Sequence, residues 1–248
     1  MLVIPLCLSI GAAVIVTSAI SGLFGMAGGL VLMLILGLIL SVQSAMVLHG
    51  VTQFFSNGWR AVLWRDWISW RTVALYCLGA LPAILVPFAL AYVPEKPVML
   101  IALGLVPYLA ATLPARLALD ATRPRHAIAC GFAASGLQLV SGVGGPLLDV
   151  FFVRSQLDRR AVVATKAMTQ AVSHLLKVAY YGALIGPAPP IGLDVYGAAI
   201  AAAIAGTTLA GPLLERMSNE NFRRWTKTIV LVIGAISIGQ GVVLLAAH

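Results

Sequence analysis

The chain has no Asp, Glu, Lys or Arg before Arg60. A stretch of that length has room for about two crossings of a bilayer at roughly 20 residues each, with a remainder for a broken helix. Across all 248 residues, 60% are hydrophobic, 10% are charged and the mean hydropathy is +1.00. So few polar side chains could not cover the apolar surface of a soluble domain. The sequence therefore predicts an integral membrane protein, and its start lacks the basic segment of a cleaved signal peptide.

Each half of the chain carries a ladder of six polar residues with the same internal spacing, at a constant offset of 117 positions. The members are His49, Thr52, Gln53, Ser56, Asn57 and Arg60 in the first ladder, and Lys166, Thr169, Gln170, Ser173, His174 and Lys177 in the second. Their spacing places each ladder on one stripe of an α-helix. Glycine-rich turns at 25–29 and 141–145 recur at an offset of 116. We therefore expect one membrane domain, residues 1–248, built from two repeats at 1–115 and 126–248.

The basic residues predict how the chain crosses the bilayer. Thirteen of the sixteen lie in four short segments, at 60–71, 116–125, 154–160 and 216–227. Short loops rich in Lys and Arg remain cytoplasmic, so the net charge of +8 reflects topology and not a nucleic-acid partner. With these loops inside, the apolar segments at about 44–64 and 161–182 run in opposite directions, and both termini lie outside. The predicted fold is an all-α polytopic membrane protein with two inverted repeats of about five helical elements each.

The apolar segments at about 28–41 and 145–153 are too short to cross a hydrocarbon layer of about 30 Å. The first two elements of each half are therefore predicted to form a glycine-broken or re-entrant hairpin, with two full crossings as the alternative. Helices that begin at the glycine turns would direct free N–H groups and a positive dipole end at a pocket, which favours an anion. Close helix packing through small residues is the other interpretation of these turns.

The polar stripes and glycine turns supply the candidate substrate-binding residues. They are Gly28, Gly29, Gly144, Gly145, His49, Thr52, Gln53, Asn57, Lys166, Thr169, Gln170 and His174. Lys166 is expected to supply the charge, so that Lys166→Ala abolishes transport while the protein stays folded. The alternative role of the stripes is hydrogen bonding between helices. Arg60 and Lys177 lie near predicted helix ends, where long cations also extend to the membrane interface.

Three titratable residues are candidates for proton coupling. Asp149 has Met33 as its counterpart in the first half, and it is either a proton carrier or an ion-pair partner of Lys166. His49 and His174 could titrate near physiological pH, or could simply bond neighbouring helices. The three cysteines lack a CxxC pattern or a His partner and are interpreted as packing residues. No metal or cofactor is predicted, and no GxSxG, HExxH or Walker pattern indicates an enzyme.

The chain resembles the TauE/SafE family of sulfite exporters and related anion permeases over about residues 8–245. Three stretches carry the resemblance: residues 20–29 (ISGLFGMAGG), 142–148 (GVGGPLL) and 164–170 (ATKAMTQ). Many members have a triple glycine in both motifs, whereas this chain has Ala27-Gly28-Gly29-Leu30 and Val143-Gly144-Gly145-Pro146. The resemblance implies a small protein of the bacterial inner membrane that moves sulfite, sulfonates, thiosulfate or related organic anions.

Together, these observations predict a secondary transporter for a small anion, with a sulfur oxyanion favoured. It would work by alternating access between inverted halves, either coupled to protons or as a facilitated carrier. An anion channel and, more remotely, an intramembrane enzyme using Ser56 or Ser173 are the alternatives. The expected partners are the anion and the lipid bilayer, with a homo-oligomer left open.

Overall fold

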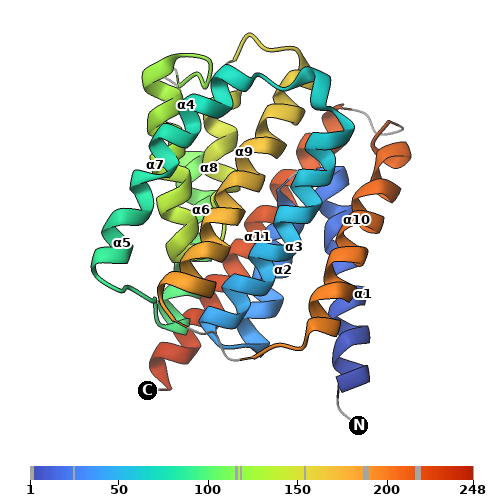
Figure 1. Ribbon diagram of the computed structural model, residues 1–248, viewed down its shortest axis with the longest axis vertical. Helices are drawn as coiled ribbons and strands as arrows, with labels where there is room; N and C mark the ends of the chain where they lie inside the picture. Colours follow the sequence, from blue (N-terminus) through green and yellow to red (C-terminus); the bar gives the residue numbers. More distant parts are fainter. Residues whose placement is uncertain are drawn as a thin grey trace.

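The computed structural model describes residues 3–24, 26–114, 117, 119–153, 155–186, 190–215 and 219–247. Gly25 of the first glycine-rich motif therefore lies outside the described residues. Within these ranges the protein is all-α (Figure 1). Its elements are α1 (Val3–Phe24), α2 (Ala27–Ile39), α3 (Val42–Leu63), η1 (Arg65–Trp67), α4 (Trp70–Ala80), η2 (Pro82–Ile84), α5 (Leu85–Ala89), α6 (Lys96–Thr112), α7 (Pro124–Ser141), α8 (Gly145–Phe152), α9 (Arg159–Ala179), the π-helical turn η4 (Tyr180–Leu184), α10 (Leu193–Glu215) and α11 (Asn219–Ala246).

Three stretches of described helix are long and apolar enough to cross a membrane: Trp70–Ala89, Leu193–Ala210 and Arg224–Ala246. Three shorter apolar helical stretches accompany them, at Ser9–Gly22, Ala27–Ile39 and Lys96–Thr112. Large hydrophobic side chains such as Leu85, Val153 and Leu209 are exposed on the surface of the bundle. A surface of that kind needs lipid around it, so the protein is an all-α membrane protein, as the sequence predicts.

Local sequence explains where the helices begin and end. The Ser41 side chain accepts a hydrogen bond from the Ser44 amide at the start of α3, at 3.3 Å. Asp158 does the same for the Arg160 amide at the start of α9, at 2.8 Å. Each of these bonds satisfies a helix N–H that has no acceptor within its own helix. At the end of α7, Gly142 has a φ of +81°, a left-handed conformation that only glycine adopts without strain.

The apolar residues at about 72–93 do not form one continuous α-helix. Helix α4 ends at Ala80, the short turn η2 begins at Pro82, and α5 follows it. Proline lacks the amide hydrogen that a helix interior needs, and its ring clashes with the carbonyl four residues earlier. Pro82 therefore accounts for the change from α-helix to a tighter turn at this point.

The helices pack in pairs that join the two halves of the chain. Helix α1 packs along α10, α4 along α7, α3 along α9, and α6 along α11. In Figure 1, α1 and α10 lie side by side on the right and α4 lies beside α7 on the left. In the division into two repeats, α1 corresponds to α7, α3 to α9, α4 to α10 and α6 to α11. The α1–α10 pair therefore corresponds to the α7–α4 pair, and the other two pairs each join a helix to its own counterpart. The division into two repeats stays a prediction, which this pairing supports.

The polar ladders lie on α3 and α9, and the directions of these two helices can be followed in Figure 1. Turn η1, which follows α3, and the connection that precedes α9 both lie at the upper end of the bundle. Helix α3 therefore runs upward and α9 runs downward. Both chain ends lie at the lower end, away from these two basic segments.

The hairpins α1–α2 and α7–α8 each have one short arm. Helix α2 has 13 residues and α8 has 8, which correspond to about 20 Å and about 12 Å of rise. Both lengths fall short of a hydrocarbon thickness of about 30 Å, which favours broken hairpins over two full crossings. The described glycines of the two turns, Gly28, Gly29, Gly142, Gly144 and Gly145, are all buried.

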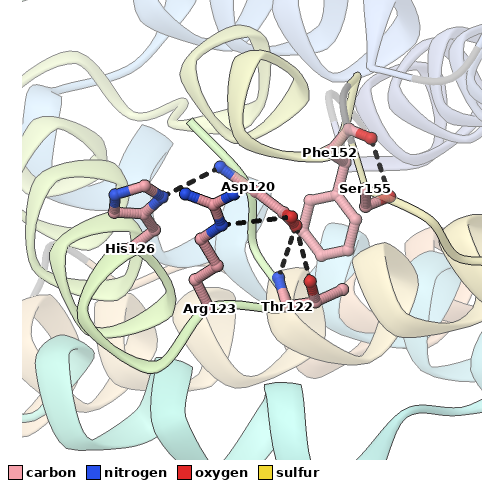
Figure 2. Close-up of polar contacts among 6 residues, drawn as sticks. All are labelled: Asp120, Thr122, Arg123, His126, Phe152 and Ser155. Atoms are coloured by element: carbon pink, nitrogen blue, oxygen red, sulfur yellow. Dashed lines mark hydrogen bonds and ion pairs between the residues drawn. The ribbon is translucent and has the colours of Figure 1, made fainter. Parts of the chain in front are cut away.

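The connector between the halves, whose internal polar contacts Figure 2 shows, is attached to the end of α8 by a backbone hydrogen bond. The Ala121 amide donates to the Phe151 carbonyl at 2.8 Å. The Asp120 carboxylate accepts from the Thr122 amide and hydroxyl, at 2.9 and 2.7 Å, and lies 3.8 Å from Arg123 Nε. His126 Nδ1 accepts from the Asp120 amide at 3.2 Å. These bonds give the connector a defined shape against the short arm of the second hairpin.

Glycines allow the α4 and α7 backbones to approach closely. A Cβ at Gly131 would overlap the Tyr76 carbonyl oxygen and lie 3.0 Å from the Ala80 amide nitrogen, whereas a Cβ at Gly136 would meet nothing within 4 Å. We expect Gly131→Ala to lower the free energy of unfolding by about 2 kcal/mol, because backbone atoms cannot move aside easily.

Gly136→Ala, on the same helix, is the matched control and should be neutral or stabilising by up to about 1 kcal/mol. Denaturant unfolding of the two purified variants measures the difference. Equal stability of both variants would contradict the close backbone contact between α4 and α7.

Candidate anion-binding site

Helices α3 and α9 are close together near Gly50. A Cβ at Gly50 would lie 2.6 Å from Val178 Cγ2, 3.2 Å from Lys177 Cε and 3.4 Å from the His174 carbonyl oxygen. The His49 and His174 rings, one from each helix, have centroids 5.4 Å apart. The absence of a side chain at Gly50 therefore brings the two polar stripes together inside the bundle.

The cation at this contact is Lys177, whose side chain is completely buried. Its Nζ lies 2.8 Å from His49 Nδ1 and donates to the Gly142 carbonyl at 2.9 Å. The alternative in which Lys177 extends to the membrane interface is therefore wrong. None of the carboxylates in the described part of the chain forms an ion pair with this ammonium. A buried charge without a counter-charge is costly, so this position favours an anion.

Hydrogen-bond geometry defines the protonation of His49. Its Nε2 lies 2.9 Å from the Gly29 carbonyl, which can only accept, so this nitrogen carries the proton. Nδ1 is then free to accept from the Lys177 ammonium at 2.8 Å. The result is one chain of hydrogen bonds from the Gly142 carbonyl through Lys177 and His49 to the Gly29 carbonyl. An ammonium has three N–H donors, and two are used here, which leaves one for a ligand.

The two glycine turns meet at the same place. A Cβ on Gly142 would lie 2.6 Å from the Met33 sulfur, and one on Gly145 would overlap the Met26 side chain. Met26 and Met33 belong to the first hairpin, whereas Gly142 and Gly145 belong to the second. The starts of α2 and α8 therefore lie in one interior region, and neither helix has a side-chain cap on its first N–H groups.

Gln53 lies beside the first of these turns. A Cβ on Gly29 would be 3.4 Å from Gln53 Oε1 and 3.9 Å from Gln53 Nε2. Asn57 Nδ2 donates to the Gln53 carbonyl at 2.9 Å and to Oε1 at 3.3 Å, which orients the amide. Gln53 is only 3% exposed, and its Nε2 is buried with no partner among the described residues. Buried polar atoms nearly always have a partner, so this N–H group is available to a bound water or ligand.

His174 has a comparable neighbour on α7. Gln138 Nε2 lies 3.3 Å from His174 Nδ1, and an amide nitrogen can only donate, so Nδ1 is the acceptor. Both residues are buried. His49 and His174 are therefore both neutral in this arrangement, with the proton on Nε2.

Lys166 lies on the same helix as Lys177 but eleven residues before it, about 16 Å of helix rise away. Its ammonium forms an ion pair with Asp149, and the two side chains are 22% and 40% exposed. Of the two interpretations of Asp149, this geometry supports the ion-pair partner. The expectation that Lys166 supplies the charge beside the glycine turns receives no support from its position, whereas Lys177 has the placement expected of such a cation.

The remaining candidates differ in what they can offer a ligand. The hydroxyls of Thr52 and Thr169 donate to carbonyls of their own helices, at 2.8 and 2.9 Å, so their protons are already used. Gln170 is half-buried. Gly28 and Gly144 are buried where the hairpins pack against themselves, against Thr17 and Ser21 in one case and Ala134 in the other.

Ser56 and Ser173 hold the ladders to neighbouring helices. Ser56 Oγ lies 2.7 Å from Thr207 Oγ1 on α10, and Ser173 Oγ lies 2.6 Å from the Tyr76 hydroxyl on α4. These contacts match the alternative role of hydrogen bonding between helices. Each serine therefore has a structural partner of its own.

Sequence reasoning missed several residues around the site. They include Gln138, Gly142 as a carbonyl acceptor, and the buried pair Tyr180 and Tyr181. The tyrosine rings meet edge to face at 4.9 Å, and the Tyr180 hydroxyl lies 2.7 Å from the Tyr92 carbonyl and 3.0 Å from the Pro87 carbonyl, between which it shares its single proton. The offset of 117 would have paired Gln138 with Ser21. No comparable signal marks the tyrosines.

Comparison with known proteins gives one result that bears on this site. No curated protein and no solved structure matches the chain significantly. The sulfite exporter TauE/SafE family, in contrast, matches residues 10–237, which include both glycine turns and both ladders. The chain therefore belongs to the sulfite exporter TauE/SafE family, a family of membrane transporters.

Proposed function

We propose that this protein is a secondary transporter of a small anion, with sulfite, an organosulfonate or a related sulfur oxyanion as cargo. The observation that carries the proposal is the buried Lys177 ammonium, which contacts the second glycine turn directly and the first through His49, without a carboxylate partner among the described residues. A ligand that brings one negative charge would remove the cost of that burial. The family supports the same class of cargo.

The proposed mechanism is alternating access between two inverted repeats in the bacterial inner membrane. The basic segments would be cytoplasmic and both termini outside, in accord with the positive-inside rule. Support comes from the antiparallel ladder helices, from the related helix pairs, and from glycine turns inside the bundle. Broken helices that direct their ends at a central site are a recurrent design of secondary transporters.

Within this mechanism the binding residues fall into two groups. Lys177, Gln53 and the glycine turns would contact the anion, with His49 and Asn57 as positioning residues. Lys166 and Asp149 would form an ion pair between α8 and α9, which must open or move when the second hairpin moves. Proton coupling through His49, His174 or Asp149 remains part of the proposal.

Counterflow in proteoliposomes tests the proposal against its alternatives. Vesicles loaded with unlabelled sulfite should accumulate external radioactive sulfite transiently, because a carrier exchanges one ion for another. Vesicles without protein provide the control. Flux that neither saturates nor shows counterflow would indicate a channel instead. Chemical conversion of the anion by the purified protein would indicate an enzyme.

A further inference from the structure

We propose that the central site selects singly charged oxyanions over doubly charged ones of the same size and shape. This inference rests on the proposed function and adds the charge of the cargo to it. The site that would carry it out is defined by the Lys177 ammonium, the Gln53 amide and the start of α2. Each is described above from its own contacts.

Among the side chains that define the site, the formal charge is +1. Arg60, whose Nη2 is also buried with no partner among the described residues, lies seven residues beyond Gln53 on α3, about 10 Å of helix rise away, and is not counted in it. Lys177 supplies one positive charge through an ammonium that already donates to two neutral acceptors, His49 Nδ1 and the Gly142 carbonyl. His49 and His174 are neutral because each has one ring nitrogen that must act as an acceptor. The next basic side chain along the second ladder, Lys166, is already neutralised by Asp149.

The neutral groups that surround the site supply donors without adding formal charge. Gln53 Nε2 is buried and has no partner among the described residues. The start of α2 lies beside it, and Met26 offers no side-chain cap to the free N–H groups there. These groups can bind the oxygens of a tetrahedral anion, and the helix end adds only about half a unit of positive charge.

Charge balance follows from this inventory. A monoanion beside Lys177 leaves these groups with no net formal charge, whereas a dianion leaves one negative charge among buried side chains. Burial of an unbalanced charge is strongly disfavoured. Sulfonates carry one charge and fit this requirement. Sulfite would be taken as hydrogen sulfite, so a proton would travel on the substrate without titration of a protein side chain.

Methanesulfonate and sulfate provide a matched pair of probes, because a methyl group in one replaces a charged oxygen in the other. Calorimetric titration of the purified full-length protein, at constant ionic strength, measures both affinities. The Kd for methanesulfonate should be at least about tenfold lower than the Kd for sulfate, a difference of about 1.4 kcal/mol in binding free energy. Equal or tighter binding of sulfate would overturn the selection rule while leaving the proposed function intact. Failure of sulfite, sulfonates, thiosulfate and sulfate alike to bind would overturn both.

Discussion

Lys177→Gln should reduce anion transport by at least about 100-fold while the protein still assembles in the membrane. The ammonium contacts the second glycine turn directly and the first through His49, and removing a buried, hydrogen-bonded charge partner of a ligand costs about 2–5 kcal/mol. Glutamine retains an N–H donor for the Gly142 carbonyl, so the variant loses the charge more than the local bonds. Radioactive sulfite exchange in proteoliposomes, normalised to incorporated protein, is the measurement.

Lys166→Gln is the informative comparison for this variant. It removes the lysine at the other end of the same ladder, but one that is partly exposed and paired with Asp149. We expect transport to fall by less than about tenfold, because an ion pair that solvent reaches contributes only about 0–1 kcal/mol. Size-exclusion profiles of both variants report on folding. Greater loss in the Lys166 variant would restore the sequence-based assignment of Lys166 as the central cation.

Gly28→Ala should have the largest effect on stability among the glycine variants at the site. A Cβ there would overlap the Thr17 carbonyl oxygen and lie 2.6 Å from the Ser21 amide nitrogen. These are backbone atoms of α1, so the turn between α1 and α2 would have to open. We expect a loss of at least about 3 kcal/mol in the free energy of unfolding, measured in detergent, and a corresponding loss of folded protein in membranes.

Gly58→Ala on α3 is the control, because a Cβ at Gly58 meets nothing within 4 Å. Alanine has a higher helix propensity than glycine, so this variant should be as stable as the parent or slightly more stable. Normal stability of Gly28→Ala would show that the first hairpin does not pack as tightly as described. The site would then lack the fixed start of α2 on which the anion proposal depends.

Much of the fold could be predicted from the sequence because hydropathy and glycine position act locally. The segment expected at about 44–64 is α3 (Val42–Leu63), and the one expected at 145–153 is α8 (Gly145–Phe152). The polar stripe also predicted which face of α3 turns inward, since His49, Thr52, Gln53, Ser56 and Asn57 are all buried. In each case the residues of one helix are enough to predict its bounds or its buried face.

The identity of the central cation could not be predicted in the same way. Lys166 and Lys177 occupy opposite ends of one ladder, and which of them reaches the glycine turns depends on where α3 and α9 come together. Gly50 permits the close contact at the Lys177 end, whereas its counterpart at the offset of 117 is Ala167. Tertiary packing of two helices therefore decided a question that the spacing left open.

The contacts α1–α10 and α4–α7 each take one helix from either half of the chain. In both pairs glycine brings the backbones together: Gly206 meets Ile15 and Ser18, and Gly79 meets Ile128 and Phe132. Helices locked in this way cannot slide past each other without steric overlap, so each pair must travel as one rigid body. If the bundle rocks, its moving parts are therefore composites of both sequence halves, and neither half alone contains a complete one.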